Sequence, residues 1–343
     1  MKKKQVTLLE LAKRLNLSPS TVSRALNGRH RISEETRQKV RTLADALDYQ
    51  PNPSARSLRE SKTWVLGVLI PEIAHGFFST AISGIEEVAI GAGYNIMICQ
   101  SHESSEREKA VADALLASRV DGLLFCPSQE TRDFSLCNQF RRRDIPVVFF
   151  DRFGADVEAS RVVVDDFGGA REVVNHLIAN GYRRIAHLAG PENLTNSQAR
   201  LEGYLTALRE HNITPDETLV RHLDLNHLNS REYGRYLLDL PEPPDAIFCF
   251  HDNSAFEIMT LAKERGVRIP DQLAIAGFSN EYASVLVEPS LTTVGQPAFA
   301  LGSAAASLIT AQLHQEEHDE PIEYQTITLP TELIIRDSTR RKA

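Results

Sequence analysis

The sequence lacks any stretch of about 18 consecutive apolar residues, and its lysine-rich start at residues 1–4 leads into an amphipathic pattern. Neither a transmembrane span nor a secretory signal is therefore expected. Cysteine is scarce: Cys99, Cys126, Cys137 and Cys249 stand far apart, with no CxxC or other metal-ligand spacing. Because three of them lie in or beside apolar segments, we expect buried free thiols in a reducing, cytoplasmic compartment. Neither a metal nor a cofactor is expected.

The composition also lacks the bias of disordered, collagen-like or low-complexity chains, since 42% of the 343 residues are hydrophobic and 24% are charged. A chain of this length exceeds one ordinary domain and indicates two or three compact units.

Charge is distributed unevenly along the chain. Residues 1–62 hold 14 Lys and Arg against 6 Asp and Glu, whereas residues 63–343 hold 24 against 40. A small basic module is thus joined to a large acidic one. This asymmetry favours a polyanion as the partner of the N-terminal module, although a merely solvated face would have the same charge.

Three short helices are predicted in the basic module, over residues 8–15, 19–26 and about 33–47. Thr7 and Glu10 have the spacing of a capping box, with Thr7 as the N-cap and Glu10 reaching back to it. Ser18-Pro19 then starts the second helix with a capping residue and a proline. Two helices joined by so short a turn and braced by a third form a helix-turn-helix, which binds DNA; a bundle used for protein contact is the alternative.

The outer face of the second helix carries Pro19, Ser20, Ser23, Arg24 and Asn27. Short hydroxyl side chains allow close approach to DNA, and an arginine can grip a guanine edge with two hydrogen bonds. Proline cannot donate a hydrogen bond, so its contact with a base would be apolar.

The segments VTLLELA (6–12), LSPSTVSRALN (17–27) and YQPN (49–52) closely resemble the headpiece of the lactose-repressor/purine-repressor (LacI/GalR) family of bacterial transcription regulators. The resemblance implies that Pro19, Ser20 and Arg24 read bases. It implies that Thr7, Ser18, Thr21, Ser23 and Asn27 hold phosphates, and it places Leu8, Arg31 and Asn52 at the same DNA surface.

Residues 49–62 contain two prolines and small polar residues, which by themselves indicate a flexible linker. The family resemblance implies instead a hinge helix that forms on operator DNA and enters the minor groove beside its partner. Leu58 would then be the wedge at the central base step, Ala55 would fit the groove floor, and Arg56 would reach a phosphate.

From residue 63 onward, apolar runs alternate with amphipathic segments, which predicts an α/β unit with parallel sheets. We expect ligands beyond the carboxyl ends of the strands. The expected strands cover residues 64–70, 94–99, 122–125, 147–150, 185–189, 246–250 and 273–277.

The same family resemblance extends over this body, through segments such as GVLIP (67–71), RVDGL (119–123), GYRRIA (181–186), RLEGY (200–204) and PSLTTV (289–294). The implied fold is an all-α helix-turn-helix headpiece (1–48) and hinge (49–62), followed by a periplasmic-binding-protein-like core (63–343). Within that core, one subdomain would comprise about 63–164 and 293–325, and the other about 165–292 and 326–338.

The resemblance implies that a small carbohydrate-like effector binds between the subdomains. Phe77 and Phe78 would pack against it and Arg200 would clamp a hydroxyl or carboxylate. Many relatives have an aspartate where this chain has Ser279, and losing that charge opposite Arg200 suggests a sugar acid or sugar phosphate. The residues expected at this site are Phe77, Phe78, Asp151, Arg152, Asn196, Arg200, His251, Asp252, Ser279 and Asn280.

Two segments have the look of catalytic motifs. The HQEEH segment at 314–318 matches the H-x-x-E-H pattern of some zinc peptidases, but a solvated helix end explains it better. Asp165 and Asp166 precede two glycines, and one of these aspartates is expected to cap a helix. We expect no enzyme, but a homodimeric regulator that binds a palindromic operator, and the family resemblance implies a repressor. A ligand-binding protein with a protein-contacting N-terminal module is the alternative, and a sugar-processing enzyme is a remote one.

Overall fold

The computed structural model describes residues 6–26, 32–49, 62–226, 229–318 and 321–340. The chain forms two compact units, Met1–Trp64 and Val65–Ala343, which we call the headpiece and the core unit. Within the described residues no helix is both long and apolar enough to cross a membrane.

The headpiece contains the three predicted helices, α1 (Leu8–Leu15), α2 (Pro19–Leu26) and α3 (Glu34–Ala46). Thr7 caps α1 as predicted, because its side chain accepts a hydrogen bond from the Glu10 amide. The predicted contact from the Glu10 side chain back to Thr7 was wrong. The Glu10 carboxylate instead accepts from Arg14, one turn along the helix, at 2.8 Å. Asn16 takes a left-handed conformation (φ 53°) that ends α1 and permits the short turn into α2.

Each headpiece helix turns its apolar stripe inward. The buried residues are Leu11, Ala12, Val22, Ala25, Val40 and Ala44. Since α1 and α2 each supply only a narrow stripe, the three helices depend on one another for burial.

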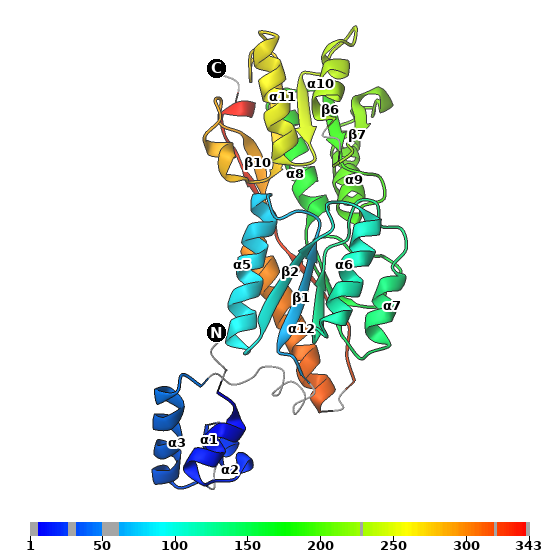
Figure 1. Ribbon diagram of the computed structural model, residues 1–343. Coiled ribbons are helices and arrows are strands. Elements are labelled where there is room, and N and C mark those ends of the chain that lie inside the picture. The colour runs from blue at the N-terminus through cyan, green and yellow to red at the C-terminus, as the bar shows by residue number, and fades with distance from the viewer. Residues whose placement is uncertain (1–5, 27–31, 50–61, 227–228, 319–320, 341–343) are drawn as a thin grey trace. The chain divides into compact units, whose positions relative to one another are not determined.

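The core unit contains two six-stranded sheets and therefore two lobes (Figure 1). The first lobe has strand order β11-β5-β4-β3-β1-β2, with all neighbours parallel. The second has the order β12-β10-β9-β8-β6-β7, parallel except for the β10–β12 pair.

The strands of the first lobe are β1 (Val65–Ile70), β2 (Asn95–Gln100), β3 (Gly122–Phe125), β4 (Val147–Phe150), β5 (Ser160–Val164) and β11 (Thr326–Leu329). Those of the second lobe are β6 (Ile185–Ala189), β7 (Val220–His222), β8 (Ala246–Cys249), β9 (Ala274–Ser279), β10 (Thr292–Gly295) and β12 (Glu332–Ile334).

Helices connect the parallel strands. They are α5 (Gly76–Gly91), α6 (Ser105–Ala117), α7 (Ser135–Arg141), α8 (Asp166–Ala179), α9 (Thr195–Glu210), α10 (Ser230–Leu238), α11 (Asp252–Glu264) and α12 (Ala298–Glu317). Short 3-10 helices occur at Glu217–Leu219, Tyr282–Val285 (η2) and Asp337–Thr339.

The chain crosses between the lobes later than expected at two of its three crossings. We expected residues 293–295 in the first lobe and 326–329 in the second, but β10 pairs with β9 in the second lobe and β11 with β5 in the first. The expected boundaries were wrong there because each strand completes its sheet before the chain crosses.

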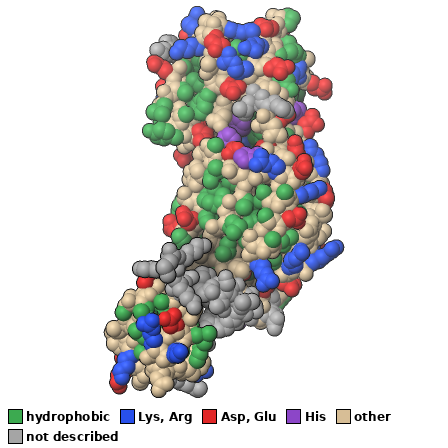
Figure 2. Space-filling view, in the orientation of Figure 1, with side chains coloured by type: hydrophobic (Ala, Val, Ile, Leu, Met, Phe, Trp, Pro, Cys, Tyr) green, Lys and Arg blue, Asp and Glu red, His purple; other side chains and the backbone are tan. Residues whose placement is uncertain are grey.

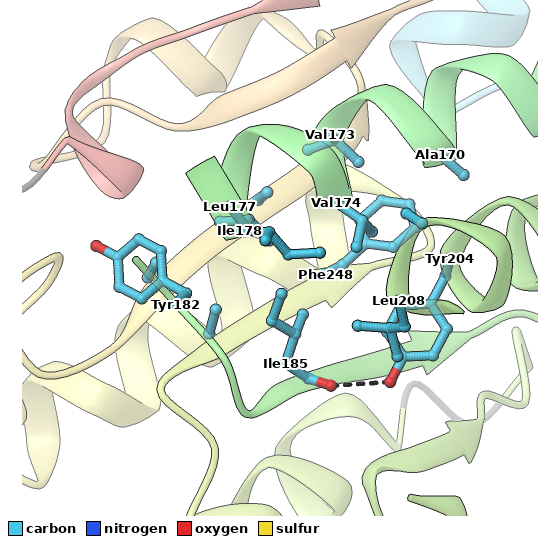
Figure 3. Close-up of a cluster of buried hydrophobic side chains, with 14 of the residues drawn as sticks. Ala170, Val173, Val174, Leu177, Ile178, Tyr182, Ile185, Tyr204, Leu208 and Phe248 are labelled. Carbon is cyan, nitrogen blue, oxygen red and sulfur yellow. Dashed lines mark hydrogen bonds between the residues drawn. The ribbon is translucent and has the colours of Figure 1, made fainter. Parts of the chain in front are cut away.

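The second lobe buries apolar side chains on both faces of its sheet. On one face, residues from α8 and α9 pack over β8, as Figure 3 shows for Val174, Leu208 and Phe248. The buried Tyr204 hydroxyl donates to the Ile185 carbonyl oxygen at 2.8 Å, which satisfies its only polar atom. Cys126, Cys137 and Cys249 are buried free thiols as predicted, whereas Cys99 is half-buried.

In the first lobe, α5 and α12 pack so closely that glycine is required at their contact. A Cβ atom at Gly302 would overlap the carbonyl oxygen of Ala81, and one at Gly84 would overlap that of Phe299. At Gly91, the last residue of α5, a Cβ would meet nothing within 4 Å.

We therefore expect Gly302→Ala to lower the free energy of unfolding by about 1–3 kcal/mol, because the two helices must move apart. Gly91→Ala is the matched control and should be neutral or slightly stabilising, since alanine favours the helix. Urea unfolding followed by circular dichroism measures both. Equal stability of the two variants would contradict this close contact.

His187 is a fully buried titratable side chain in β6. Its ring stacks on Phe248 with centroids 4.6 Å apart, and Nδ1 lies 3.0 Å from the Phe248 carbonyl oxygen, to which it donates. Nε2 is buried without a hydrogen-bond partner. Burial lowers the pKa of His187 to about 3, so the folded protein holds the ring neutral.

Because the pKa of His187 is lower in the folded protein than in the unfolded chain, unfolding takes up a proton below about pH 6.5. Stability due to this residue is complete above pH 6.5 and falls as the pH approaches 3. Between pH 7.5 and 5.0 it should contribute a loss of about 2 kcal/mol. His187→Phe should flatten the pH dependence by that amount in urea unfolding, whereas His211→Asn, at an exposed position, should leave the slope unchanged.

Candidate functional sites: a headpiece surface and a cleft

The first candidate site is the outer face of α2. Ser18, Pro19, Ser20 and Arg24 are exposed, and Thr21 and Ser23 are half-buried. The Ser18 hydroxyl accepts from the Thr21 amide at 3.1 Å and lies 2.8 Å from the hydroxyls of both Ser20 and Thr21. The N-terminus of α2 therefore presents a cluster of hydroxyl groups beside one arginine, which suits phosphate and base contacts.

Thr7 is also exposed, while Leu8 is half-buried and packs against the headpiece core. The remaining predicted DNA contacts lie outside the described residues: Asn27, Arg31, Asn52, Ala55, Arg56 and Leu58.

The second candidate site is a cavity of about 380 Å³ between the two lobes of the core unit. Its walls come from segments that follow the carboxyl ends of strands in both sheets, where ligands of α/β proteins bind. In Figure 2 the histidine side chains visible on this face lie at the boundary between the two lobes. Nine of the ten predicted effector residues line the cavity: Phe77, Phe78, Asp151, Arg152, Asn196, Arg200, His251, Asp252 and Ser279.

Asn280 is the exception and does not line this cavity. Its backbone is left-handed (φ 56°), and its side-chain oxygen accepts from the Arg336 guanidinium at 2.7 Å. Asn280 lines a separate surface pocket that contains Arg336 and Tyr282. Ser279 lines both pockets, whereas Asn280 lines only the one beside Arg336.

Arg200 is buried in α9 and connects three elements of the second lobe. Its Nε and Nη2 both lie 2.8 Å from Oδ1 of Asp166, and Nη1 donates to the Phe250 carbonyl oxygen at 2.6 Å. The guanidinium also lies over the Phe278 ring, 3.7 Å from its centroid. Arg200 is therefore held rigidly in the cavity wall.

Sequence reasoning missed Asp166 as the partner of Arg200. Asp165 caps α8 through the Gly168 amide, as one of the two aspartates was expected to do. Asp166 begins the helix and points to the buried arginine instead. Burial raises the pKa of Asp166 to about 6, because it outweighs the lowering by Arg200.

Arg152 is the buried cation of the first lobe. Nη1 donates to both carboxylate oxygens of Glu103 at 2.9 Å and to the Pro127 carbonyl oxygen at 3.2 Å. Nε lies 3.6 Å from Oδ2 of Asp151 and has no hydrogen-bond partner. Burial raises the pKa of Asp151, and the positive charges of Arg152 and Arg200 oppose that rise.

His251 and Asp252 start α11 and have distinct roles. The His251 Nδ1 accepts from the Ser254 amide at 3.0 Å, so the proton of the neutral ring is on Nε2. Burial lowers the pKa of His251 to about 4, which keeps the ring neutral near pH 7. Asp252 accepts from Thr293, from the Glu281 amide and from Ser284, and so anchors the loop that follows β9.

Polar atoms without partners lie at this cavity. The Oδ1 of Asn196 and the Oε1 of Gln296 are buried without hydrogen bonds, as is the Nε of Arg152. All three residues line the cavity. Since buried polar groups are normally satisfied, these atoms are candidate contacts for a ligand.

The cavity also contains eleven residues outside the expected set. They are Glu72, Ala74, His75, His102, Glu103, Leu225, Asn226, Phe250, Asn253, Glu281 and Gln296. All of them lie within five residues of a strand's carboxyl end, and the rule that ligands bind there had already indicated the segment 71–78. Gln296 follows β10, which we did not predict as a strand.

The zinc-peptidase-like segment is a helix end, as interpreted. His314 and His318 are exposed at the C-terminal end of α12, and their rings stack with centroids 4.3 Å apart. Among the described residues no group of three or more His, Cys, Asp or Glu side chains is arranged to hold a metal ion.

Comparison with known proteins agrees with both sites. Residues 7–52 match the family described as bacterial regulatory proteins, lacI family, and residues 174–339 match a periplasmic binding protein-like domain. The chain is 33% identical over 334 residues to the HTH-type transcriptional repressor CytR of Escherichia coli (strain K12), covering 97% of this chain and 96% of that one. It is 31% identical over 336 residues to catabolite control protein A of Priestia megaterium, covering 98% and 99%.

Solved structures are similar over the same length. The lac repressor dimer bound to operator and the anti-inducer ONPF superposes with a TM-score of 0.85 at 26% identity, covering 98% of this chain and 99% of that one. The complex of the transcriptional regulator CelR with cellobiose has a TM-score of 0.74 at 27% identity, covering 97% and 100%. The chain therefore belongs to the lacI family of bacterial regulatory proteins and is a DNA-binding transcription regulator.

Proposed function

We propose that this regulator represses transcription as a symmetric dimer on a palindromic operator, and that a neutral, carbohydrate-like effector in the cleft controls it. The observation that carries the effector proposal is the set of unpartnered polar atoms at a cavity whose arginines are already paired with acids. The effector would bridge the two lobes and change their relative orientation. The hinge at residues 49–62 would transmit that change to the headpiece.

The headpiece reads DNA through α2 in this proposal. Ser18, Ser20 and Thr21 supply hydroxyl groups for phosphates, and the exposed Arg24 reaches a base edge. With several phosphate contacts per subunit, operator affinity should fall on the order of ten-thousand-fold between 50 and 200 mM salt.

A duplex selection from random sequence tests the DNA proposal directly. We expect an enriched palindrome, and we expect Arg24→Ala to weaken binding to it by about 10- to 100-fold while relaxing the preference at one base position of each half-site. Arg41→Ala removes an equal charge from an exposed position on α3 and should leave that preference intact. The absence of any enriched palindrome would favour the alternative of a headpiece that contacts protein.

The proposed dimer surface combines exposed apolar residues from both lobes. Tyr282 at the start of η2 is 79% exposed, Leu286 just after η2 is 66% exposed, and Ile90 near the end of α5 is 62% exposed. Met97 and Ile98 add further exposed apolar area on β2, which is the edge strand of its sheet. Figure 2 shows hydrophobic side chains gathered on this face near β10 and over α5 and β2. Exposed apolar side chains gathered on one face in this way are typical of a subunit interface.

The charges around the cavity favour an uncharged effector and disfavour the sugar acid or phosphate inferred from Ser279. Arg152 is paired with Glu103, and Arg200 with Asp166. Asp151 adds a third buried carboxyl group, so an anion would find acids in excess. The neutral His251 and the amides of Asn196 and Gln296 instead provide donors and acceptors suited to hydroxyl groups. The T-shaped pair Phe77 and Phe78 offers an apolar wall.

A thermal-shift screen distinguishes the two effector classes. A neutral sugar present at about one hundred times its Kd should raise the melting temperature of the core unit by about 5 °C, whereas the corresponding sugar phosphates and acids should not. Asn196→Ala should abolish that shift, and Asn138→Ala, on the surface of α7, should preserve it. A shift produced by acids and phosphates alone would overturn the proposal of a neutral effector.

A further inference from the structure

Gln129 lies in a loop that the first lobe holds firmly. The loop follows β3, and the buried Glu108 of α6 accepts from the Ser128 amide at 2.7 Å and from the Thr131 hydroxyl at 2.8 Å. The Ser128 and Thr131 hydroxyls also lie 2.9 Å from each other. Residues 128–131 are therefore fixed to the first lobe by interactions that do not involve the second.

From this loop, Gln129 makes three hydrogen bonds to the second lobe. Its Nε2 donates to Oδ1 of Asp224 at 2.8 Å, and its Oε1 accepts from the Leu225 amide at 2.8 Å. Its carbonyl oxygen accepts from the Asn193 side chain at 2.9 Å. Both ends of the side-chain amide are thus used across the cleft, and the residue is only 7% exposed.

Gln129 also connects to the effector cavity through one carboxylate. Its backbone amide donates to Oε2 of Glu103 at 2.6 Å. The same carboxylate accepts both hydrogen bonds from Nη1 of Arg152. Glu103 and Arg152 line the cavity from the first lobe, and Leu225 lines it from the second. Gln129 is therefore one hydrogen bond away from cavity residues on both sides.

A separate set of contacts bridges the lobes elsewhere. The Phe77 amide donates to Oε1 of Glu281 at 3.2 Å, and His75 lies 3.1 Å from the side-chain nitrogen of Asn253. In Figure 1, α5 and β10 lie on one side of the core unit, and α7 and β7 on the other. Phe77 is in the first turn of α5, where amides have no partner within the helix, so its hydrogen bond depends on the second lobe.

We propose that Gln129 is a positioning residue that holds the two lobes together over the cavity and couples that closure to the Glu103–Arg152 pair. An effector that contacts Arg152 and a closed cleft stabilise the same arrangement of Glu103, so each favours the other. This inference rests on the proposed function, because closure can affect regulation only if an effector binds in the cavity. Its test uses the full-length protein without added ligand, so its failure would leave the effector proposal standing.

The test is hydrogen–deuterium exchange of Gln129→Glu, read by mass spectrometry. A carboxylate at position 129 would face Asp224 and repel it, so the lobes should separate. Exchange should rise about tenfold in peptides that contain Leu225 and also in those that contain Phe77, which no contact with Gln129 protects directly. Gln139→Glu, the same change at an exposed position of α7, should leave both peptides unchanged.

The double variant Gln129→Glu with Asp224→Asn should restore slow exchange in both peptides. Asparagine removes the repelling charge, and its Nδ2 can donate to the new carboxylate in place of the bond that Oδ1 of Asp224 accepts from Gln129. Faster exchange in peptides from the buried strand β3 would mean that Gln129→Glu unfolds the first lobe. In that case Gln129→Met replaces it in the test, because methionine removes both side-chain hydrogen bonds without adding a charge.

Faster exchange at Phe77 that is reversed in the double variant would support the role of Gln129 in closure. Acceleration confined to the Leu225 peptide would show a local contact and overturn the proposal. Unchanged exchange at both places would overturn it as well, as would a double variant that exchanges as fast as Gln129→Glu.

Discussion

Two guanidinium groups, those of Arg152 and Arg200, lie buried on either side of the cleft, and the arrangement of the site depends on how their charges are balanced. A buried cation is tolerated only when acids and hydrogen-bond acceptors surround it. Arg200 consequently holds Asp166 on α8 and the carbonyl group of Phe250 after β8 in fixed positions. Burial raises the pKa of Asp166 to about 6, which shows that the pairing only partly offsets its desolvation.

The same constraint determines what the cavity can bind. Glu103 and Asp151 lie beside Arg152, so neither arginine presents an uncompensated charge to a ligand. What remains for recognition is a set of neutral groups, including the His251 ring and the amides of Asn196 and Gln296, beside the two phenylalanines. Ser279, where many relatives have an aspartate, therefore removes a charge from a site already supplied with acids, and this is why we propose a neutral effector.

Contacts across the cleft give the two lobes a defined closed arrangement. Gln129, Glu281 and Asn253 each bond to a segment of the opposite lobe. In the proposed regulation these contacts would stabilise one of two arrangements, because an effector can shift the lobes only by favouring one arrangement. The separation of charge along the chain favours DNA contact through the headpiece, since the acidic core unit repels the phosphate backbone and the basic headpiece attracts it.

The sequence by itself determined the local elements. Capping residues and apolar periodicity predicted α1 and α2, and continuous apolar runs predicted β3, β4 and β6 with their observed bounds. It did not reveal β5, β7 or β10–β12, which are short strands, several at sheet edges and only half-buried. The strand-end rule and the family motifs together located nine cavity residues, but only the tertiary structure showed Asp166 as the partner of Arg200, Asn280 turned toward Arg336, and Gln129 bonded to Asp224. Local patterns depend on neighbours within a few residues, whereas these pairings join residues 34, 56 and 95 positions apart, and only the path of the folded chain brings them together.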